Sequence, residues 1–423
     1  MFNDPLILEQ MRKLFIFILI MSALSCKKEV KIPDNSILRG PFLTSLIDDK
    51  KVTLKYFSQY ISGVFTTYTS VDPDYFDIYE SDGQLNMFKE VIDLKNDNNY
   101  EYTLNGLKNN SSYYFYVVGK KEGYKSLYSD TIMIVPNPGL PSQTMIKFNN
   151  NQTISLVSYS PVKNQIAYVD KNYAWNGGAN CCMAESIILS SIDNQGSELL
   201  AIDSEDPDWS SGGDKIVFAE ETLGHGYFSQ IAVYDVNSKI ITKLTNDTTY
   251  NYNPAFSPSD DKLLYQSNKN RPDINSTNIW MMDLSTLNTE LIIDLSKNSF
   301  VNVSRPEWVN EIDFIFQGTG SNNRTSIYKS SVSTKKTETL IESGWNDYNA
   351  SVSPDACKIA FISDRSGADQ LWLYNIQTKE YKQLTGYNND EYFDGNWTKI
   401  NWIGNNQLLF TFGDNRLIRL ILN

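Results

Sequence analysis

A short segment recurs six times in the C-terminal two-thirds of the sequence, and this repetition limits the fold more than any other feature. Each copy has an apolar or aromatic anchor residue, then a turn, and then a short apolar run such as "KIVF" or "KIAF". The anchors are Tyr159, Trp209, Phe256, Trp308, Val352 and Trp402, separated by 50, 47, 52, 44 and 50 residues. Such periods are typical of folds in which each unit buries its apolar surface against its neighbours.

Each copy continues with a third predicted strand, and the second strands are apolar on both faces, as expected for sheets stacked between sheets. The third strands are 187–192, 231–236, 279–284, 327–332, 371–376 and 417–422, and copies two to five add a fourth strand, as at 243–245 and 383–385. Four antiparallel strands repeated six times predict a six-bladed β-propeller. The sixth copy has only three strands before Asn423, so we predict that 143–148 pairs with 417–422, covers that edge and closes the ring.

These repeats resemble those of the TolB-type β-propeller, on three features: the aromatic-Ser-Pro-Asp-Gly turn, a second strand that runs into "SDRSG", and a closing Leu-Thr. The resemblance covers residues 143–423, and Ala356 departs from it by replacing the turn glycine. It implies the fold, and it implies that Asp364 and Arg365 are structural loop residues. TolB carries an α/β domain before its propeller, whereas this chain has a strand-rich region there, so TolB's partners are not implied.

Residues 40–136 form a second strand-rich block with turn residues between the apolar runs. The predicted strands are 51–57, 75–81, 101–107, 112–120 and 130–136. Several short alternating strands within about 100 residues predict a β-sandwich. Leu107 followed by Tyr113 resembles the leucine and corner tyrosine of fibronectin type III domains, which serve mostly as spacers or adhesion modules. Residues 137–142 are rich in proline and glycine and are predicted to form a short, stiff linker.

The segment 11–26 has the pattern of an export signal. Arg12 and Lys13 precede an apolar run of eight residues, which is too short to span a bilayer, and "ALSC" ends at Cys26. This resembles a bacterial lipoprotein signal and implies cleavage before Cys26, lipidation of Cys26 and a tether at 27–39. Lys27 after that cysteine favours the outer membrane, on its periplasmic side or at the cell surface. A plain secretory signal is the alternative, and it also exports the chain.

The charge balance and the scarcity of histidine exclude several functions. The formal net charge is −13 and the pI is about 4.7, which disfavours nucleic acid as a partner. His225 is the single histidine, no G-x-S-x-G motif is present, and no His/Cys spacing typical of zinc occurs. No catalytic residue is therefore assigned. Chemistry that needs only two carboxylates, as in glycosidases, stays open because the chain has 50 acidic residues.

The candidate ligand site lies in irregular loops that gather at one face of the propeller, near blades six, one and two. These are the long loops 170–186 and 220–229 and the acidic loops 203–208 and 388–394. The candidate residues are Tyr173, Trp175, His225, Asp203, Glu205, Asp206, Asp208, Asp390, Glu391 and Asp394. Aromatic side chains beside carboxylates suit sugars, a basic peptide segment or a cation such as calcium. No other cofactor is expected, and no metal ligand set is assigned.

Two adjacent cysteines, Cys181 and Cys182, lie in the same loop region. In an oxidising compartment they form a vicinal disulfide, pair between chains or stay reduced, and the sequence leaves these alternatives open. Cys357 is expected on the opposite face.

The sequence thus predicts an all-β protein, an immunoglobulin-like sandwich of fibronectin type III character followed by a six-bladed propeller. Its expected function is that of a lipid-anchored extracytoplasmic binding or scaffold protein that holds a glycan, peptide or protein. A carboxylate-dependent enzyme acting on polysaccharide and a structural envelope component are the alternatives.

Overall fold

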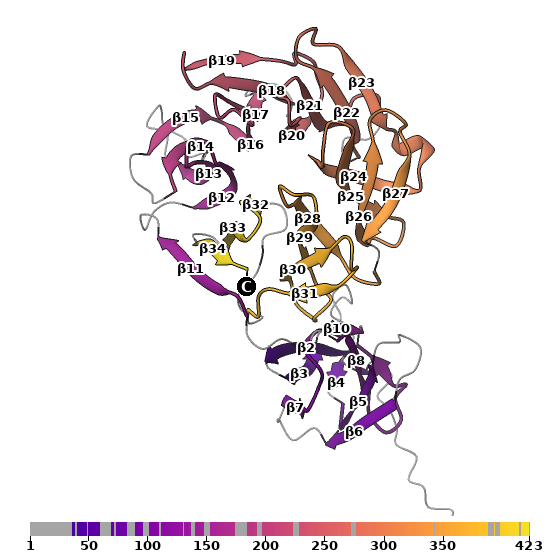
Figure 1. The fold of residues 1–423 in the computed structure, drawn as a ribbon. Coiled ribbons are helices and arrows are strands. Elements are labelled where there is room, and N and C mark those ends of the chain that lie inside the picture. Colours follow the sequence, from indigo (N-terminus) through magenta and orange to yellow (C-terminus); the bar gives the residue numbers. More distant parts are fainter. Residues whose placement is uncertain are drawn as a thin grey trace, which may run out of the picture.

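The chain folds as an all-β protein in the part that the structure describes (Figure 1). The computed structural model describes residues 36–422 except 39, 49, 60–68, 72, 83–88, 96–100, 110, 130, 137–139, 148–152, 174–183, 193–196, 223–227, 272–275, 342, 388–392, 394–397 and 414–415. Its one helix there is the short 3-10 helix η1 (Leu295–Lys297). No helix among these residues is long and apolar enough to cross a membrane.

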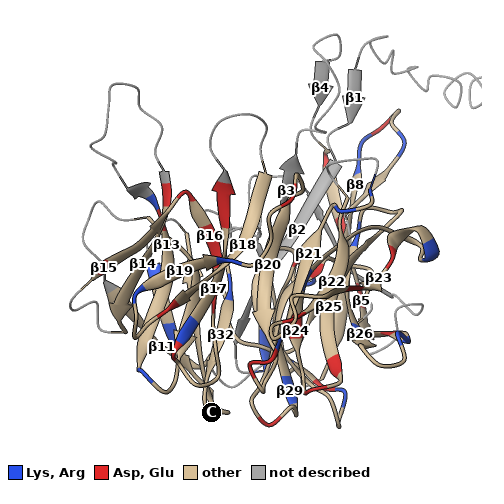
Figure 2. Ribbon diagram, turned by 90° about the horizontal axis from the view of Figure 1, so that it is seen from above, with Lys and Arg blue, Asp and Glu red and all other residues tan. Residues whose placement is uncertain are grey.

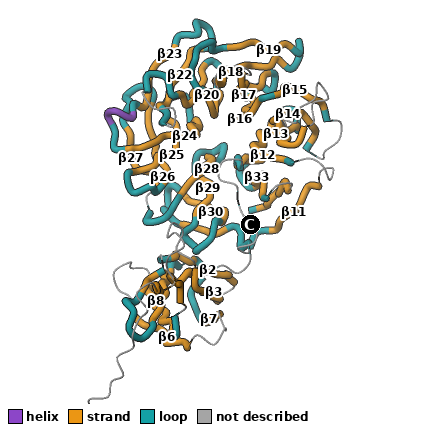
Figure 3. The backbone as a smooth tube through the Cα atoms, turned by 180° about the vertical axis from the view of Figure 1, so that it is seen from behind, coloured by secondary structure: helices purple, strands orange, loops and turns teal. Residues whose placement is uncertain are grey.

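Six four-stranded antiparallel sheets surround a central axis as the blades of a propeller (Figures 1 and 3). Blades one to three are β12 (Ile154–Ser160), β13 (Gln165–Tyr173), β14 (Ala184–Ser191) and β15 (Glu198–Ile202); β16 (Ser204–Trp209), β17 (Lys215–Thr222), β18 (Phe228–Asp235) and β19 (Ile240–Lys243); and β20 (Asn251–Phe256), β21 (Lys262–Ser267), β22 (Asn278–Asp283) and β23 (Thr289–Ile293). Blades four and five are β24 (Phe300–Trp308), β25 (Asp313–Gly320), β26 (Thr325–Ser331) and β27 (Thr337–Ile341); and β28 (Asp347–Val352), β29 (Lys358–Ser363), β30 (Gln370–Asn375) and β31 (Tyr381–Gln383).

Blade six combines strands from two distant parts of the chain. It consists of β32 (Ile400–Ile403), β33 (Gln407–Phe412), β34 (Arg416–Ile421) and the outer strand β11 (Ser142–Lys147). β11 pairs antiparallel with β34 over six residue pairs, from Ser142 opposite Ile421 to Lys147 opposite Arg416. The predicted closure of the ring by residues near 143–148 is therefore confirmed.

The core of the propeller lies between blades, as the two-sided apolar second strands predicted. One cluster joins Val169 of blade one to Phe218 of blade two, and another joins Leu264 of blade three to Phe316 of blade four. One expectation was incomplete, because blade one also has a fourth strand, β15. Only Ala201 is buried in β15, so the run lacks the alternating apolar pattern by which the other strands were predicted.

The turn between first and second strands demands a left-handed residue in most blades. Asn164, Gly213, Asp260 and Ala356 have φ angles of 51°, 68°, 58° and 53° at comparable places in blades one, two, three and five. Asn, Asp and Gly tolerate this conformation, whereas alanine is strained by its Cβ.

We therefore expect Ala356→Gly to stabilise the protein, although glycine usually weakens a fold. Relief of the left-handed strain should outweigh the greater entropy of the unfolded glycine, for a net gain of up to about 1 kcal/mol. Urea unfolding would measure the gain. Ala350→Gly is the control within the preceding strand and should destabilise, and a loss of stability in Ala356→Gly would contradict the strain argument.

The N-terminal region forms two sheets that pack over one core. One sheet contains β2 (Gly40–Asp48), β3 (Lys51–Gln59) and β7 (Glu101–Asn105). The other contains β5 (Tyr75–Asp82), β6 (Lys89–Lys95), β8 (Tyr113–Lys120), β9 (Leu127–Tyr128) and β10 (Ile132–Ile134), and a separate parallel pair joins β1 (Ser36–Leu38) to β4 (Thr69–Val71). Val52 and Leu54 of the first sheet meet Phe76 and Phe115 of the second, all fully buried. These two larger sheets are called the N-terminal sheets below.

The observed strands of the N-terminal sheets agree well with those predicted from the sequence. The five predicted strands overlap β3, β5, β7, β8 and β10, while the sequence pattern did not predict β2 and β6. Tyr113 folds back so that its hydroxyl accepts a hydrogen bond from the backbone N–H of Lys108 at 2.8 Å. Leu107 is buried in the same core. These two residues therefore fix the conformation of the segment that connects β7 to β8.

Candidate functional site

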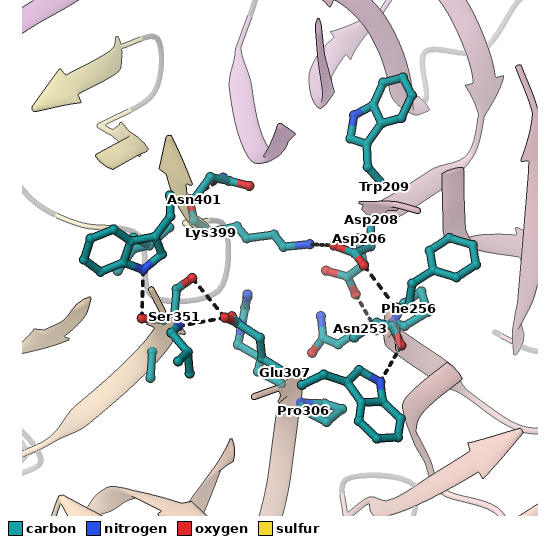
Figure 4. Close-up of a pocket in the computed structure, with 18 of the residues that line it drawn as sticks. Asp206, Asp208, Trp209, Asn253, Phe256, Pro306, Glu307, Ser351, Lys399 and Asn401 are labelled. Carbon is teal, nitrogen blue, oxygen red and sulfur yellow. Dashed lines mark hydrogen bonds and ion pairs between the residues drawn. The ribbon is translucent and has the colours of Figure 1, made fainter. Parts of the chain in front are cut away.

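A cavity of about 320 Å³ lies on the propeller axis, enclosed by the first strands of the blades (Figure 4). Its wall combines polar and apolar residues in similar measure, and all six blades contribute to it. Its charged and amide-bearing residues include Asp206, Asp208, Asn253, Arg305, Glu307 and Lys399. Ser211 and Pro258, which follow first strands, also line it, so the cavity lies toward the end of the channel where first strands turn into second strands.

A β-bulge interrupts the first strand in blades one to five. The pairing of first and second strands shifts register in blades one to five, and each bulge contains a residue with positive φ. These residues are Leu156, Asp206, Asn253, Arg305 and Asn349, with φ between 44° and 54°. Each lies three residues before its anchor, as does Lys399 in blade six. Bulges re-aim side chains, which explains how Asp206, Asn253, Arg305 and Asn349 come to line the cavity, whereas Lys399 lines it without a bulge.

Residues directly before the anchors join neighbouring blades. Ser158 Oγ accepts from Trp209 N at 3.3 Å, Asp208 Oδ2 from Phe256 N at 3.1 Å, Glu307 Oε1 from Val352 N at 2.8 Å, and Asn401 Oδ1 from Tyr159 N at 3.1 Å. At the two remaining junctions the indole N–H of Trp308 donates to Ala255 O, and that of Trp402 donates to Ser351 O, each at 3.1 Å. Asp208, Glu307 and Asn401 are therefore first of all structural residues that hold the ring of blades together.

Two cations reach into the channel. Lys399 Nζ lies 2.8 Å from Asp208 Oδ1 and 3.0 Å from the carbonyl oxygen of Pro207, so it connects blade six to blade two. Arg305 Nη1 lies 3.4 Å from the carbonyl oxygen of Thr398, although blades four and six are not neighbours. The Arg305 guanidinium thus reaches across the channel, and its charge also acts on Glu205 of blade two.

Carboxylates gather at the other end of the channel, where first strands begin. Figure 2 shows acidic segments at the upper end of blade two. Burial, together with the charges of Asp206, Glu185 and Glu221, raises the pKa of Glu205 to about 9, and Arg305 opposes this. Burial and Glu221 also raise the pKa of Glu185 to about 7. At neutral pH Glu205 therefore holds a proton beside the carboxyl group of Asp206.

The raised pKa of Glu205 predicts a pH-dependent stability. Its ordinary value is 4.5 and its folded value about 9, so the folded state binds this proton more tightly than the unfolded state. The resulting stabilisation is complete below pH 4.5 and is lost as the pH rises toward 9. Glu205→Gln mimics the protonated form, so it should match the wild type at pH 5 and exceed its unfolding free energy at pH 9 by about 1–3 kcal/mol.

Urea unfolding at both pH values measures this difference. Glu290→Gln, which alters a carboxylate that is half exposed on an outer strand, is the control and should change neither value appreciably. If the unfolding free energies of wild type and Glu205→Gln differed by the same amount at pH 5 and pH 9, the raised pKa would be contradicted.

The structure describes four of the predicted site residues with their side chains. Asp203, Glu205 and Asp206 lie together at the start of blade two, and Asp208 lies deeper in the channel. Tyr173 ends β13, and its side chain is not among those described. The remaining predicted residues, Trp175, Cys181, Cys182, His225, Asp390, Glu391 and Asp394, lie outside the described residues, as does Cys26. Cys357 lies, as expected, in the turn between β28 and β29 and is a free thiol.

Sequence reasoning missed Arg305, Glu307, Lys399 and the channel asparagines. The signal was available in the repeat alignment, because these residues lie one or three places before an anchor. They were not predicted because they occupy regular strand positions, and residues at such positions normally serve packing. Among the described residues, no group of three or more His, Cys, Asp or Glu side chains is placed to hold a metal ion.

No family model matches the chain. Among solved structures, it is similar to TolB from Acinetobacter baumannii, with 17% identity, 74% of this chain and 77% of that chain covered, and a TM-score of 0.47. It is also similar to an oligogalacturonate lyase from Vibrio parahaemolyticus (9% identity, 67% and 98% covered, TM-score 0.42). A third is the β-propeller domain of the Trilobed protease from Pyrococcus furiosus (12% identity, 73% and 91% covered, TM-score 0.43). The propeller assignment itself rests on the strand pairing of the six blades.

Proposed function

We propose that this protein is a lipid-anchored extracytoplasmic binding protein whose propeller holds a ligand in its central channel. The observation that supports this most is the axial cavity of about 320 Å³, a size suited to a small molecule or a few residues of a chain. Asp206, Asn253, Arg305 and Asn349 line it from left-handed bulge positions. Strained non-glycine backbone often marks ligand sites, because the fold must hold it in place.

The charge distribution favours a ligand that brings hydroxyl or cationic groups to the acidic mouth. The charges of Asp206 and Glu221 add to burial in raising the pKa values of Glu185 and Glu205 there. Below them, Arg305 and Lys399 supply donors inside the cavity. A glycan or a segment of peptide or protein offers both kinds of group, and each remains a candidate.

The anchor and the role of the N-terminal sheets belong to the same proposal. Two sheets over a shared core, with the Tyr113 hydroxyl hydrogen bonded near the start of its own strand, support a fibronectin type III-like module. Such a module would connect a lipidated Cys26 to the propeller. The export signal around Arg12 and Lys13 supports a place in the cell envelope, with the outer membrane as the destination.

One observation favours a second candidate function, an enzyme that acts on polysaccharide. Glycoside hydrolysis needs one protonated and one ionised carboxyl group, and Glu205 with its raised pKa lies next to Asp206 in β16. Asp206 is held in place by accepting a hydrogen bond from Asn253 N at 3.0 Å. Loss of turnover with retained binding in Asp206→Asn would favour the enzyme.

The experiment is a binding screen on the fragment 27–423. Its thermal stability is measured against purified glycans, basic and acidic peptides, and calcium, followed by calorimetry for each hit. Arg305→Asn and Asp206→Asn remove channel charges yet keep residues that tolerate the left-handed bulge, as Asn253 and Asn349 do in neighbouring blades. Each should weaken binding at least ten-fold, while Glu290→Gln should bind as the wild type does. Binding that neither channel variant changes would refute the channel site, and no binding across the panel would favour a structural envelope role.

A further inference from the structure

The outer face of the N-terminal sheets contacts two loops of the propeller, one that enters blade five and one between β29 and β30. The backbone N–H of Met133 donates to the carbonyl oxygen of Arg365, and Ser45 Oγ donates to that of Ser366 at 3.1 Å. From the propeller side, the indole N–H of Trp345 donates to the carbonyl oxygen of Thr131. Backbone groups of both parts therefore complete one another's hydrogen bonding.

Apolar side chains reinforce this contact. Tyr114 stacks on Trp345, with ring centroids 6.1 Å apart and planes 8° from parallel. Met133 and Val135 are 3% and 2% exposed, yet they belong to a core cluster of blades four and five rather than to the core between the N-terminal sheets. Their burial therefore depends on the propeller, and the contact is a packed interface rather than a loose approach.

The same part of the chain supplies the strand that closes the propeller. Six residues, 136–141, separate Val135 in the interface from Ser142 at the start of β11, and they span about 20 Å at most. Leu140 packs where Gly386 has no side chain, and Tyr387 Oη donates to Gln143 Oε1 at 2.6 Å. A strand held on so short a connection pairs at a high effective concentration.

We propose that docking of the N-terminal sheets on blade five and closure of blade six by β11 are coupled. The docked sheets thereby stabilise the closed ring of blades. Docking fixes the start of β11, and β11 in turn covers β34. Release of the sheets leaves β11 held at one end only, through residues 148–153 that lead to β12, and so lowers its tendency to pair. Blade six supplies Lys399 and Asn401, so opening of its outer edge loosens one wall of the axial cavity. This inference does not depend on what the cavity binds.

The test is hydrogen exchange on the fragment 27–423 carrying Tyr114→Ser and Met133→Asp. Neither side chain is part of the core between the N-terminal sheets, so those sheets remain folded while a carboxylate is forced out of the interface. We expect exchange in 142–147 and 416–421 to speed up at least ten-fold, with β19 of blade two unchanged. Leu264→Ala in blade three is the control for general destabilisation and should raise exchange in the outer strands of all blades alike.

An engineered disulfide tests whether faster exchange in β34 results from the loss of β11 pairing. Thr144 and Arg419 are directly opposed in β11 and β34, so Thr144→Cys with Arg419→Cys fixes the closure. In the undocked variant the disulfide should restore slow exchange in 416–421 under oxidising conditions and not under reducing ones. Unchanged exchange of β11 while residues 131–135 lose protection would overturn the proposal. If residues 131–135 stay protected, Val135→Asp is added, and continued protection of both segments under that substitution would also overturn it.

Discussion

Replacement of residues 142–147 by an equally long Gly-Ser segment should lower the unfolding free energy of the propeller by about 3–5 kcal/mol and its melting temperature by roughly 10 °C. β11 forms six residue pairs with β34 and partly covers the cluster that contains Leu409 and Leu417. Without it, β34 becomes an exposed edge strand, and an edge of this kind also invites association with other chains. Keeping the length constant separates lost pairing from a shortened connection.

Calorimetry measures the effect, and light scattering reports association. The matched control is a Gly-Ser replacement of Ile240–Lys243 (β19), whose four residues are all exposed and which is the outer strand of blade two. That change should cost less, because β19 is shorter and does not close the ring. Equal melting temperatures for wild type and the β11 replacement would show that closure contributes nothing.

Asp347→Asn should lower the unfolding free energy by about 3–5 kcal/mol relative to the wild type. This is a larger loss than we expect for substitution of any charged residue of the axial channel. Asp347 and Arg365 form an ion pair at 2.5 Å with side chains 0% and 1% exposed. The guanidinium lies 4.4–5.8 Å from the rings of Trp345, Phe361, Trp372 and Tyr381. Loss of the carboxylate leaves a buried positive charge that the aromatic faces and the hydrogen bond to Ser363 Oγ balance only in part.

Urea unfolding checks this value against Asp313→Asn, which breaks a partly exposed ion pair with Lys329 and should cost less than about 1 kcal/mol. The double variant Asp347→Leu with Arg365→Met should recover much of the loss, because no charge then remains buried. A cost for Asp347→Asn as small as that of the Asp313→Asn control would mean that water reaches Arg365 when the carboxylate is gone.

The repeat made the propeller predictable because each blade buries the same kind of surface. Anchors such as Trp209 and apolar runs such as "KIVF" fix the period, and the strand deficit of the last copy correctly predicted where β11 lies. Blade one's β15 was missed, since an outer strand with one buried residue leaves almost no pattern. An exposed outer strand can be formed by many different sequences, because few of its side chains are packed.

The candidate site was harder to predict, for a reason seen in Arg305. A strand position normally alternates between two faces, and only the bulge, with φ at 51°, turns this side chain toward the axis. Bulges have no firm sequence signature where the residue is not glycine. The docking role of the Arg365 loop was missed for a related reason, because it depends on a surface of the N-terminal sheets more than 200 residues away in the chain.

The junctions between blades also show that the six repeats are no longer equivalent. Four junctions use a side-chain acceptor, Ser158, Asp208, Glu307 or Asn401, and two use an indole donor, from Trp308 and Trp402. The partners of these side chains are backbone groups that every blade offers, but blade three has Ala255 before its anchor and therefore depends on the anchor tryptophan of the blade that follows it. Although the six units share one pattern, blades three and four are thus matched to each other, and recombination that separated them would lose this hydrogen bond wherever the new neighbour lacks a tryptophan.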